Sequence, residues 1–305
     1  MKRVSIITVN FNQPKVTEEL LHSIPDTYTN LEVIVVDNGS NVDPTVEWKE
    51  KYPGIKFTRS INNLGFAGGN NLGIKVATGE YLFLVNNDTE FTDGLIEKLV
   101  AVLDTNPETG MVSPKIKYFN NKNLIQYSGY TPMNYYTGRN ICIGLHEIDS
   151  GQYDDINGPT AYCHGAAMLV RRDAIVKAGP IAENFFLYYE EVDWCERIKR
   201  AGYQAWICND ALIYHKESVT VGKKSRLKEY FMNRNRMLFI RRNASLFEKM
   251  VFYPYFILLV VPRNVLSYLK DKNYNFIPAL LQAVWWNLRR NKNSNNLGYP
   301  IQTIK

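Results

Sequence analysis

The sequence YLFLVNND at residues 81–88 joins a fully apolar run to a polar triplet. Five consecutive apolar residues predict a strand that is buried on both faces. Ligands of an open α/β sheet bind beyond the C-terminal ends of its strands, and the triplet lies at such an end. A carboxylate flanked by amide oxygens suits a hard divalent cation, so Asp88 is a candidate ligand for Mg²⁺ or Mn²⁺. Asn and Asp also form turns, and a plain junction between strand and turn is the alternative.

The residues around this run alternate between strand and helix patterns. We expect, in chain order, a strand at 4–9, a helix at 14–23, a strand at 31–36, a helix at 45–52, a strand at 55–59, a helix at 69–77, the strand at 81–85 and a helix at 95–104. This order predicts an α/β fold whose mostly parallel sheet is flanked by helices. Each polar cluster follows a strand, so the clusters should meet at one edge of the sheet.

The second half of the chain is less regular. Residues 111–155 are rich in Tyr and Asn without a clear period, and we interpret them as irregular strands and loops that shape a cleft. A buried strand at 165–171 and a helix at 193–201 follow, and beyond Leu227 the pattern is helical. We therefore predict a main domain at 1–225, which carries the site, and a helical C-terminal region at 226–305.

The composition is that of an ordinary globular chain of 305 residues, 45% of them hydrophobic and 22% charged. The four cysteines form no CxxC pair and lack metal-ligand spacing, so a reduced compartment is the simplest interpretation. The N-terminal apolar run is interrupted by Asn10 and Asn12, which makes it too short for a signal peptide. We therefore expect the protein in the cytoplasm.

The net charge of +6 is unevenly distributed, because residues 223–249 contain nine basic and two acidic side chains. A solvated basic helix face, a nucleic-acid site, and a contact with membrane phosphate or a pyrophosphate ligand are the interpretations of such a segment. The residues that follow it favour the membrane, and we expect no nucleic-acid partner.

Two apolar stretches, 250–261 and 276–288, follow the basic segment. The first runs for only twelve residues before Pro262, short of the roughly 20 that a spanning helix needs. The second carries two Trp residues, and two Arg residues come directly after it. Aromatic residues beside basic ones predict peripheral docking on the inner face of the plasma membrane. A pair of core helices or an oligomer interface is the alternative.

Two polar loops upstream of residue 81 are candidate ligand contacts. Asp37 ends the second strand, where an acidic residue commonly hydrogen-bonds a ribose, although its DNGS context is also an ideal turn. The loop NNLGFAGGNN at 62–71, with Asn63, Gly65 and Asn70, lets the backbone approach a ligand at the start of a helix. It matches neither GxGxxG nor GxxxxGK[ST], so neither a dinucleotide cofactor nor ATP hydrolysis is indicated.

The sequence FFLYYEEVDWC at 185–195 places three carboxylates directly after an aromatic run. Mutual repulsion and partial burial should raise the pKa of at least one of them, which is how a carboxylate becomes a general base near neutral pH. Asp193 is also explained by the preference for acidic residues in the first turn of a helix. We therefore take Glu190 and Glu191 as the catalytic candidates.

Two of the four histidines follow or precede strand patterns. His215 comes after the apolar residues 211–214, and it could complete the coordination of a cation with Asp88. His164 precedes a strand of small residues and could contact a sugar hydroxyl. A lone His is more often a packed or surface residue, and His22 and His146 have no context that assigns them a role.

The chain resembles the family 2 glycosyltransferases with the GT-A fold over roughly residues 4–230. The resemblance rests on six segments in the order in which the family has them: VSIITVNFN, EVIVVDNGS, NNLGFAGGNNLGI, YLFLVNNDT, HGAAMLVRRDA and FFLYYEEVDWCERIKRAGY. Within the family, the chain looks most like the rhamnosyltransferase-like and galactofuranosyltransferase-like enzymes of bacterial surface polysaccharides.

The resemblance implies roles for individual residues. Val9, Phe11 and Asp37 would line the base and ribose of a nucleotide donor. Asn87 and Asp88 stand at the family's DXD metal motif, where only one carboxylate remains in this sequence. Asn70 replaces a residue that is basic in many relatives.

Glu191 stands where the family usually has the Asp of a Glu-Asp pair, and it is one methylene longer. The resemblance implies an inverting, metal-dependent glycosyltransferase that moves a sugar from a nucleotide-diphosphate sugar to a saccharide or lipid-linked acceptor. A sugar nucleotidyltransferase is one alternative, although it would have a Gly-rich basic loop where this chain has residues 10–13, NFNQ. A non-catalytic nucleotide-sugar-binding or scaffold homologue is the other, and the oligomeric state stays open.

Overall fold

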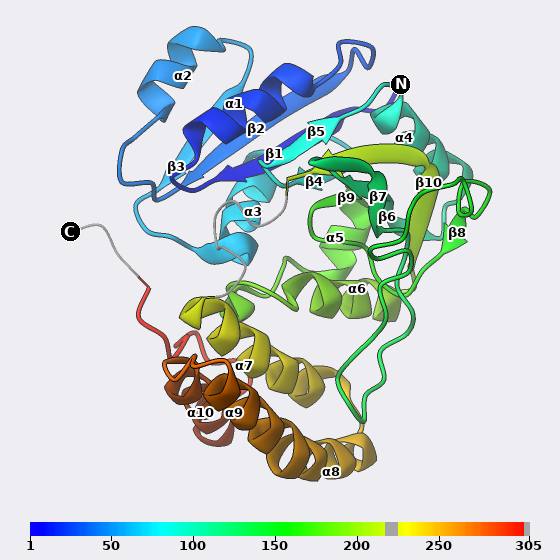
Figure 1. Cartoon of the computed structure of the whole chain (residues 1–305). Coiled ribbons are helices and arrows are strands. Elements are labelled where there is room, and N and C mark those ends of the chain that lie inside the picture. The colour runs from blue at the N-terminus through cyan, green and yellow to red at the C-terminus, as the bar shows by residue number, and fades with distance from the viewer. Residues whose placement is uncertain (217–224, 302–305) are drawn as a thin grey trace.

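The structure is a computed structural model, and it describes residues 1–216 and 225–301 (Figure 1). The first two residues of the basic segment, Lys223 and Lys224, lie outside the described residues. The strands are β1 Val4–Asn10, β2 Leu31–Asn38, β3 Lys56–Ser60, β4 Tyr81–Val85, β5 Thr89–Phe91, β6 Thr109–Tyr118, β7 Asn121–Tyr127, β8 Gly158–Pro159, β9 Ala167–Arg171 and β10 Gln204–His215. The helices are α1 Pro14–Ser23, α2 Thr45–Lys51, α3 Gly65–Val76, α4 Leu95–Thr105, α5 Arg172–Ala178, η1 Glu183–Phe185, α6 Glu190–Arg200, α7 Arg226–Asn243, α8 Leu246–Tyr255, η2 Phe256–Val260, α9 Val261–Lys270 and α10 Phe276–Arg289.

The strands form one sheet with the order β3-β2-β1-β4-β9-β6-β10-β5, and β7 and β8 pair with β6 and β10. β3, β2, β1 and β4 are parallel, as the alternation of strands and helices predicts. β9 enters between β4 and β6 in the opposite direction, and β5 is antiparallel to β10. The sheet is therefore parallel in its N-terminal half and mixed in the rest. The GT-A class of α/β fold is confirmed.

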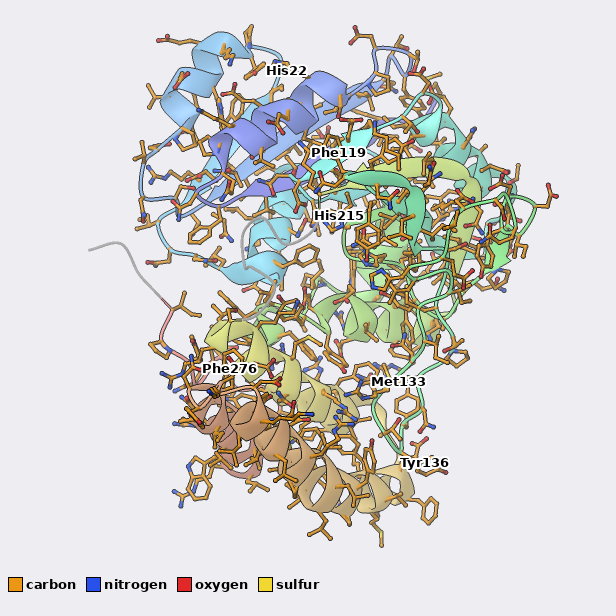
Figure 2. The ribbon with its side chains drawn as sticks, in the orientation of Figure 1. His22, Phe119, Met133, Tyr136, His215 and Phe276 are labelled. Carbon is orange, nitrogen blue, oxygen red and sulfur yellow. The ribbon has the colours of Figure 1, made fainter. Side chains whose placement is uncertain are left out.

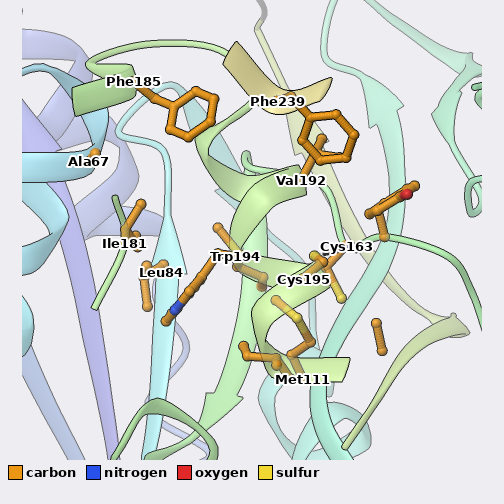
Figure 3. Packing of buried hydrophobic residues seen from close by; sticks show 14 of the residues in the cluster. Ala67, Leu84, Met111, Cys163, Ile181, Phe185, Val192, Trp194, Cys195 and Phe239 are labelled. Atoms are coloured by element: carbon orange, nitrogen blue, oxygen red, sulfur yellow. Dashed lines mark hydrogen bonds between the residues drawn. The ribbon is translucent and has the colours of Figure 1, made fainter. Parts of the chain in front are cut away.

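Neighbouring residues of the central strands point to opposite faces and build two cores. Ile6 and Phe83 pack with α1 and α4 on one face, whereas Ile7 and Leu84 pack with α3, α5 and α6 on the other. Figure 3 shows the second core, in which Trp194 of α6 lies near Leu84. Helices on both faces bury the central strands completely, which is why YLFLV is apolar at every position.

Three predictions differ from the structure by more than two residues. Residues 109–118 form a continuous central strand, β6, which the sequence hides because polar residues such as Ser113 and Lys115 are buried within it. α3 begins at Gly65, four residues before the predicted start, and α6 begins at Glu190, three residues before. After β7 the chain makes a long excursion toward α8, and Figure 2 shows Tyr136 near its tip, beside that helix.

The C-terminal helices pack below α6 and α7 in the view of Figure 1. α8, η2 and α9 run on continuously from Leu246 to Lys270, because Pro254 is accommodated within α8 and Pro262 falls in the first turn of α9. The twelve-residue apolar stretch before Pro262 therefore lies within a longer helical run, and the inference that this segment is too short to span a membrane was wrong. Among the described residues this is the one helical run long and apolar enough to cross a membrane, with a mean hydropathy of 1.4.

Candidate active site

A chain of hydrogen bonds runs along the C-terminal edge of the parallel strands. Asn87 Nδ2 donates to Thr17 Oγ1 at 3.0 Å, and Thr17 Oγ1 donates to Asn10 Oδ1 at 3.0 Å. Asn10 Nδ2 donates to Asp37 Oδ1 at 2.8 Å, and Arg59 Nε pairs with the other carboxylate oxygen of Asp37 at 3.1 Å. The predicted residues Asn87 and Asp37 are thus held by hydrogen bonds to their neighbours. We call this network at the strand ends the polar floor; it consists of Asn87, Thr17, Asn10, Asp37 and Arg59.

Asp88 and His215 meet at this edge, although they lie more than a hundred residues apart in the sequence. Nε2 of His215 lies 3.1 Å from Oδ1 of Asp88, and both side chains are buried. On its other side, Nδ1 of His215 lies 2.8 Å from Oε1 of Gln126. Because Gln126 Oε1 accepts, Nδ1 carries a proton, and in the neutral ring Nε2 presents a lone pair to the carboxylate. Asp88 Oδ1 is a buried oxygen without a hydrogen-bond partner in the structure.

These atoms fit a divalent cation. Two acceptors facing each other are stabilised only by a shared proton or metal ion, and Asp88 Oδ1 and His215 Nε2 form such a pair. Two ligands that bind one Mg²⁺ at right angles, each at about 2.1 Å, lie about 3 Å apart. Gln126 occupies the place of the outer partner that orients a ligating His. Within the described ranges no group of three His, Cys, Asp or Glu side chains converges, so the other ligands would be substrate oxygens and water.

The loop before α3 is held in a tight conformation. Asn38 Oδ1 accepts from Leu64 N at 3.0 Å, and Asn63 Oδ1 accepts from Gly65 N at 2.8 Å. Gly65 has a φ of +70°, and a Cβ there would lie 2.2 Å from the carbonyl oxygen of Phe186. The close approach explains why glycine stands at this position, and it joins the α3 loop to the segment that precedes α6.

Three further predicted contacts lie near this loop. Val9 packs directly on α3, because a Cβ at Gly69 would lie 2.8 Å from Val9 Cγ1. Phe11 is half-buried just after β1. Asn70 is buried, and its Nδ2 donates to Phe66 O within α3 at 2.9 Å. Its amide hydrogen bond is therefore made within its own helix.

The segment before α6 has an unusual backbone. Phe186, Tyr188 and Tyr189 have φ values of +67°, +71° and +70°, in the left-handed region that bulky residues rarely adopt. Such conformations cost free energy, and they persist where surrounding contacts impose them. The strained segment leads directly into Glu190 and Glu191, the first residues of α6.

Both glutamates carry a buried carboxylate oxygen, Oε2, without a hydrogen-bond partner in the structure. Burial, and then the charge of Glu191, hold the pKa of Glu190 well above its usual range. Burial raises the pKa of Glu191 to about 6. Near neutral pH Glu191 is thus a largely ionised carboxylate whose proton affinity suits a general base, while the raised pKa of Glu190 favours its protonated form.

His164 lies between the glutamates and the Asp88–His215 pair, the candidate metal-ligand pair. Its ring centroid lies 6.3 Å from that of His215, and the ring stacks on Tyr130 at 6.1 Å. Nδ1 of His164 accepts from Ala166 N at 3.1 Å, so Nε2 carries the proton. Burial lowers the pKa of His164 to about 3, which keeps the ring neutral.

The next residue after His164 completes the link, because a Cβ at Gly165 would lie 3.7 Å from Cγ of Glu191. The structure therefore brings together Asp88, His215, His164 and Glu191.

Asp193 does not join this group. It is fully buried, and its carboxylate binds Arg197 Nε at 3.0 Å and Arg242 Nε at 2.9 Å. This carboxylate ties α6 to α7, which agrees with its interpretation as a structural residue of the helix start.

Sequence reasoning missed several residues that build the site. Thr17, Asn10 and Arg59 complete the polar floor, and Gln126 orients His215. Arg59 and Gln126 lie on strands whose sequences give no sign of a partner across the sheet. Asn235 of α7 is fully buried, but it lies in a helix rich in Arg and Asn, so its sequence context gives no signal either.

Comparison with known proteins agrees with this arrangement. Residues 5–178 match the family described as glycosyl transferase family 2. The low-salt glycan biosynthesis hexosyltransferase Agl10 of Haloferax volcanii is 26% identical over 290 residues, which cover 92% of this chain and 90% of that protein. The N-acetylglucosaminyl-diphospho-decaprenol L-rhamnosyltransferase of Mycobacterium tuberculosis is 21% identical, with 72% of this chain and 77% of that protein covered.

Solved structures share the fold at lower identity. The mannosyltransferase PcManGT of Pyrobaculum calidifontis, solved with GDP-Man and Mn²⁺, superposes with a TM-score of 0.57 at 17% identity, and the match covers 94% of this chain and 87% of that one. Staphylococcus aureus TarS 1–349 gives a TM-score of 0.55 at 17% identity, covering 97% of this chain and 89% of that one.

Proposed function

The chain belongs to glycosyl transferase family 2, and from this membership we propose that it transfers a sugar, with inversion, from a nucleotide-diphosphate sugar to a hydroxyl of a saccharide or lipid-linked acceptor. The observation that carries the proposal is the His164–Gly165 turn. It contacts Glu191 on one side and lies beside His215 on the other. The proposed base and the proposed diphosphate-binding pair would thus lie on either side of this turn, which supports the transfer reaction.

Glu191 is the proposed base. Its carboxylate would take the proton of the acceptor hydroxyl while the oxygen attacks the anomeric carbon from the face opposite the departing diphosphate. The neutral Nε2–H of His164 would donate a hydrogen bond to a sugar hydroxyl. Asp88 and His215 would hold a divalent cation, Mg²⁺ or Mn²⁺, which neutralises the charge of the diphosphate.

The donor would lie along the polar floor. Val9, Phe11 and Asp37 would contact the nucleoside, and Asn63 and Gly65 the sugar-phosphate side. Asn87 would position Asp88, and Asn70 would shape the start of α3 through Phe66. The named relatives act in glycan biosynthesis and on a decaprenyl-diphosphate-linked sugar, which supports a lipid-linked acceptor and a role in surface polysaccharide assembly.

The proposal predicts slow hydrolysis of one nucleotide sugar in the absence of acceptor. The full-length protein should release nucleoside diphosphate from at least one member of a panel of UDP-, GDP- and dTDP-sugars when Mn²⁺ is present, because water can replace the acceptor hydroxyl. The same sugar should raise the melting temperature, since ligands that bind the folded state stabilise it. Binding without any turnover, with or without candidate acceptors, would instead identify a non-catalytic homologue.

We also propose that the C-terminal helices dock on the inner face of the plasma membrane. Phe252, Phe256 and Val260 of the α8–η2 run pack into the protein core. On the same run Leu258 and Leu266 are about two-thirds exposed, 68% and 66%. An apolar face opposite a protein-packed face suits a helix lying in the membrane interface better than one that spans it. Docking would bring the cleft to a lipid-linked acceptor.

A charge on this face should weaken membrane binding. Leu258→Asp with Leu266→Asp places two carboxylates against anionic lipid, so co-sedimentation with vesicles of phosphatidylglycerol at low salt should fall severalfold. Val46→Asp on α2, a residue with 66% exposure outside the C-terminal helices, is the matched control and should bind like the parent. Equal sedimentation of all three proteins would make the face a contact between copies or with another protein.

A further inference from the structure

Three consecutive polar residues of α7 are buried. Arg234 and Asn235 have 0% of their surface exposed, and Arg236 has 4%. The basic segment that contains them is therefore not simply a solvated helix face. Asn is a poor residue for a helix interior, and buried polar groups are costly without partners. These side chains need a structural or functional reason.

All three residues bind backbone carbonyls outside their own helix. Nδ2 of Asn235 lies 2.9 Å from Phe185 O, 2.8 Å from Leu187 O and 2.8 Å from Tyr188 O. Nη1 of Arg234 donates to Oδ1 of Asn235 at 2.6 Å, which fixes the orientation of the amide. Arg234 Nη2 also donates to the carbonyl oxygen of residue 184 at 2.7 Å.

The carbonyls that Asn235 binds belong to the strained segment before α6. Two of the left-handed residues, Phe186 and Tyr188, lie within the span 185–188 that the amide contacts, and Tyr189 follows it. Phe185 also packs in the core with Phe239 of α7 and Val192 of α6, as Figure 3 shows. The conformation is thus imposed from α7, and it sets where α6 begins.

The same helix also holds the excursion after β7. Nε of Arg236 donates to Thr137 O at 2.9 Å in this excursion. Tyr189 Oη donates to Gly138 O at 3.2 Å, so the excursion also contacts the strained segment. α7 therefore binds both the segment that leads into Glu191 and the excursion that contacts this segment.

We propose that Asn235 is a positioning residue for the transfer reaction: its carboxamide holds residues 185–188 in the conformation that aims Glu191 at the acceptor. Arg234 orients that carboxamide. This inference rests on the proposed function, because it gives Asn235 its role through Glu191. It also predicts that the loss of this carboxamide speeds amide hydrogen exchange of residues 184–192, which can be measured without catalysis.

The test is Asn235→Leu in the full-length protein, a substitution of similar size that removes both amide donors. With the nucleotide sugar that the parent turns over, we expect kcat to fall at least about tenfold, since a small misplacement of a catalytic group costs up to about a hundredfold. The Kd of the nucleoside diphosphate with Mn²⁺ should stay within about threefold, because the metal-ligand pair lies on other elements. Amide hydrogen exchange of residues 184–192 should accelerate at least about tenfold.

Asn233→Ala is the matched control, since Asn233 is also a buried amide of α7 but donates to Glu229 O within the helix. It should leave kcat and the exchange of residues 184–192 within about twofold of the parent. If Asn235→Leu does not fold, Arg234→Met removes the orienting hydrogen bond together with the guanidinium that lies over the Trp286 ring, and puts an unbranched apolar side chain in its place. It should then show the same loss of kcat and the same faster exchange.

Other outcomes overturn the inference. A variant that folds and matches Asn233→Ala in kcat and exchange would show that the amide does not position the loop. An equal loss of kcat and of nucleotide affinity would show damage to the whole domain. A parent protein without turnover would contradict the proposed function alone, and the exchange experiment would still decide whether Asn235 holds the loop.

Discussion

Glu191→Gln is expected to lower kcat by about 10²- to 10⁴-fold, because the amide keeps the shape of the side chain but cannot accept the proton of the acceptor hydroxyl. The measurement is sugar transfer to a hydroxyl acceptor at saturating donor. The affinity for nucleoside diphosphate should change little, since Glu191 lies at the start of α6 and the metal-ligand pair lies at the ends of β4 and β10.

The parent enzyme should lose activity on acidification. Burial raises the pKa of Glu191 to about 6, and only the ionised carboxylate accepts a proton, so kcat/KM, which reports the free enzyme, should fall as the pH drops through about 6. The effect on folding has the opposite sign. A carboxyl with a raised pKa favours the folded state most below its unfolded pKa, near 4.5, and this contribution is lost as the pH rises through about 6.

Glu190→Gln is the control that tests which of the two neighbouring glutamates is the base. Burial and the charge of Glu191 hold the pKa of Glu190 well above its usual range, which favours its protonated form and makes it a less available base than Glu191. We expect Glu190→Gln to lower kcat less than Glu191→Gln does. The pH below which the activity falls should be the same as in the parent. If Glu190→Gln abolishes turnover while Glu191→Gln retains it within a few-fold, the base is Glu190.

The parallel half of the sheet could be predicted from sequence because its signals are local. YLFLV is apolar at every position because β4 is covered on both faces, and the polar residues after each strand meet at one edge because β1, β2 and β4 are parallel. The strands at Val4–Asn10 and Tyr81–Val85 could thus be predicted without knowing which distant residues pack against them.

The contacts that orient the site could not be predicted in this way, because they join residues far apart in the chain. Gln126 is a strand residue whose side chain binds His215, and nothing near it in the sequence indicates that pairing. The buried partners of Arg234 and Arg236 are main-chain carbonyls, which carry no sequence signal at all. The basic composition of residues 223–249 therefore predicted contact with solvent or phosphate, whereas Arg234 and Arg236 make buried hydrogen bonds.

Removal of the carboxylate at Asp88 should abolish the metal-dependent part of nucleotide binding. Asp88→Ala leaves His215 as the one remaining protein ligand of the pair, and Lewis-acid stabilisation of a leaving group contributes several kcal/mol, so kcat should fall at least about a hundredfold. The direct measurement is calorimetry of nucleoside diphosphate binding with Mn²⁺ and with chelator. The parent should bind much more tightly with the metal, whereas Asp88→Ala should bind equally weakly in both conditions.

His215→Gln tests the contribution of the second candidate metal ligand to nucleotide binding. It removes the imidazole but keeps a polar side chain beside Gln126, so the loss of metal dependence should be partial. His22→Gln on α1 is the control, because His22 is exposed and contacts Tyr52 rather than the strand ends. If nucleotide affinity of the parent is the same with Mn²⁺ and with chelator, the 3.1 Å contact between Asp88 and His215 has a structural role, and the diphosphate is bound by other groups.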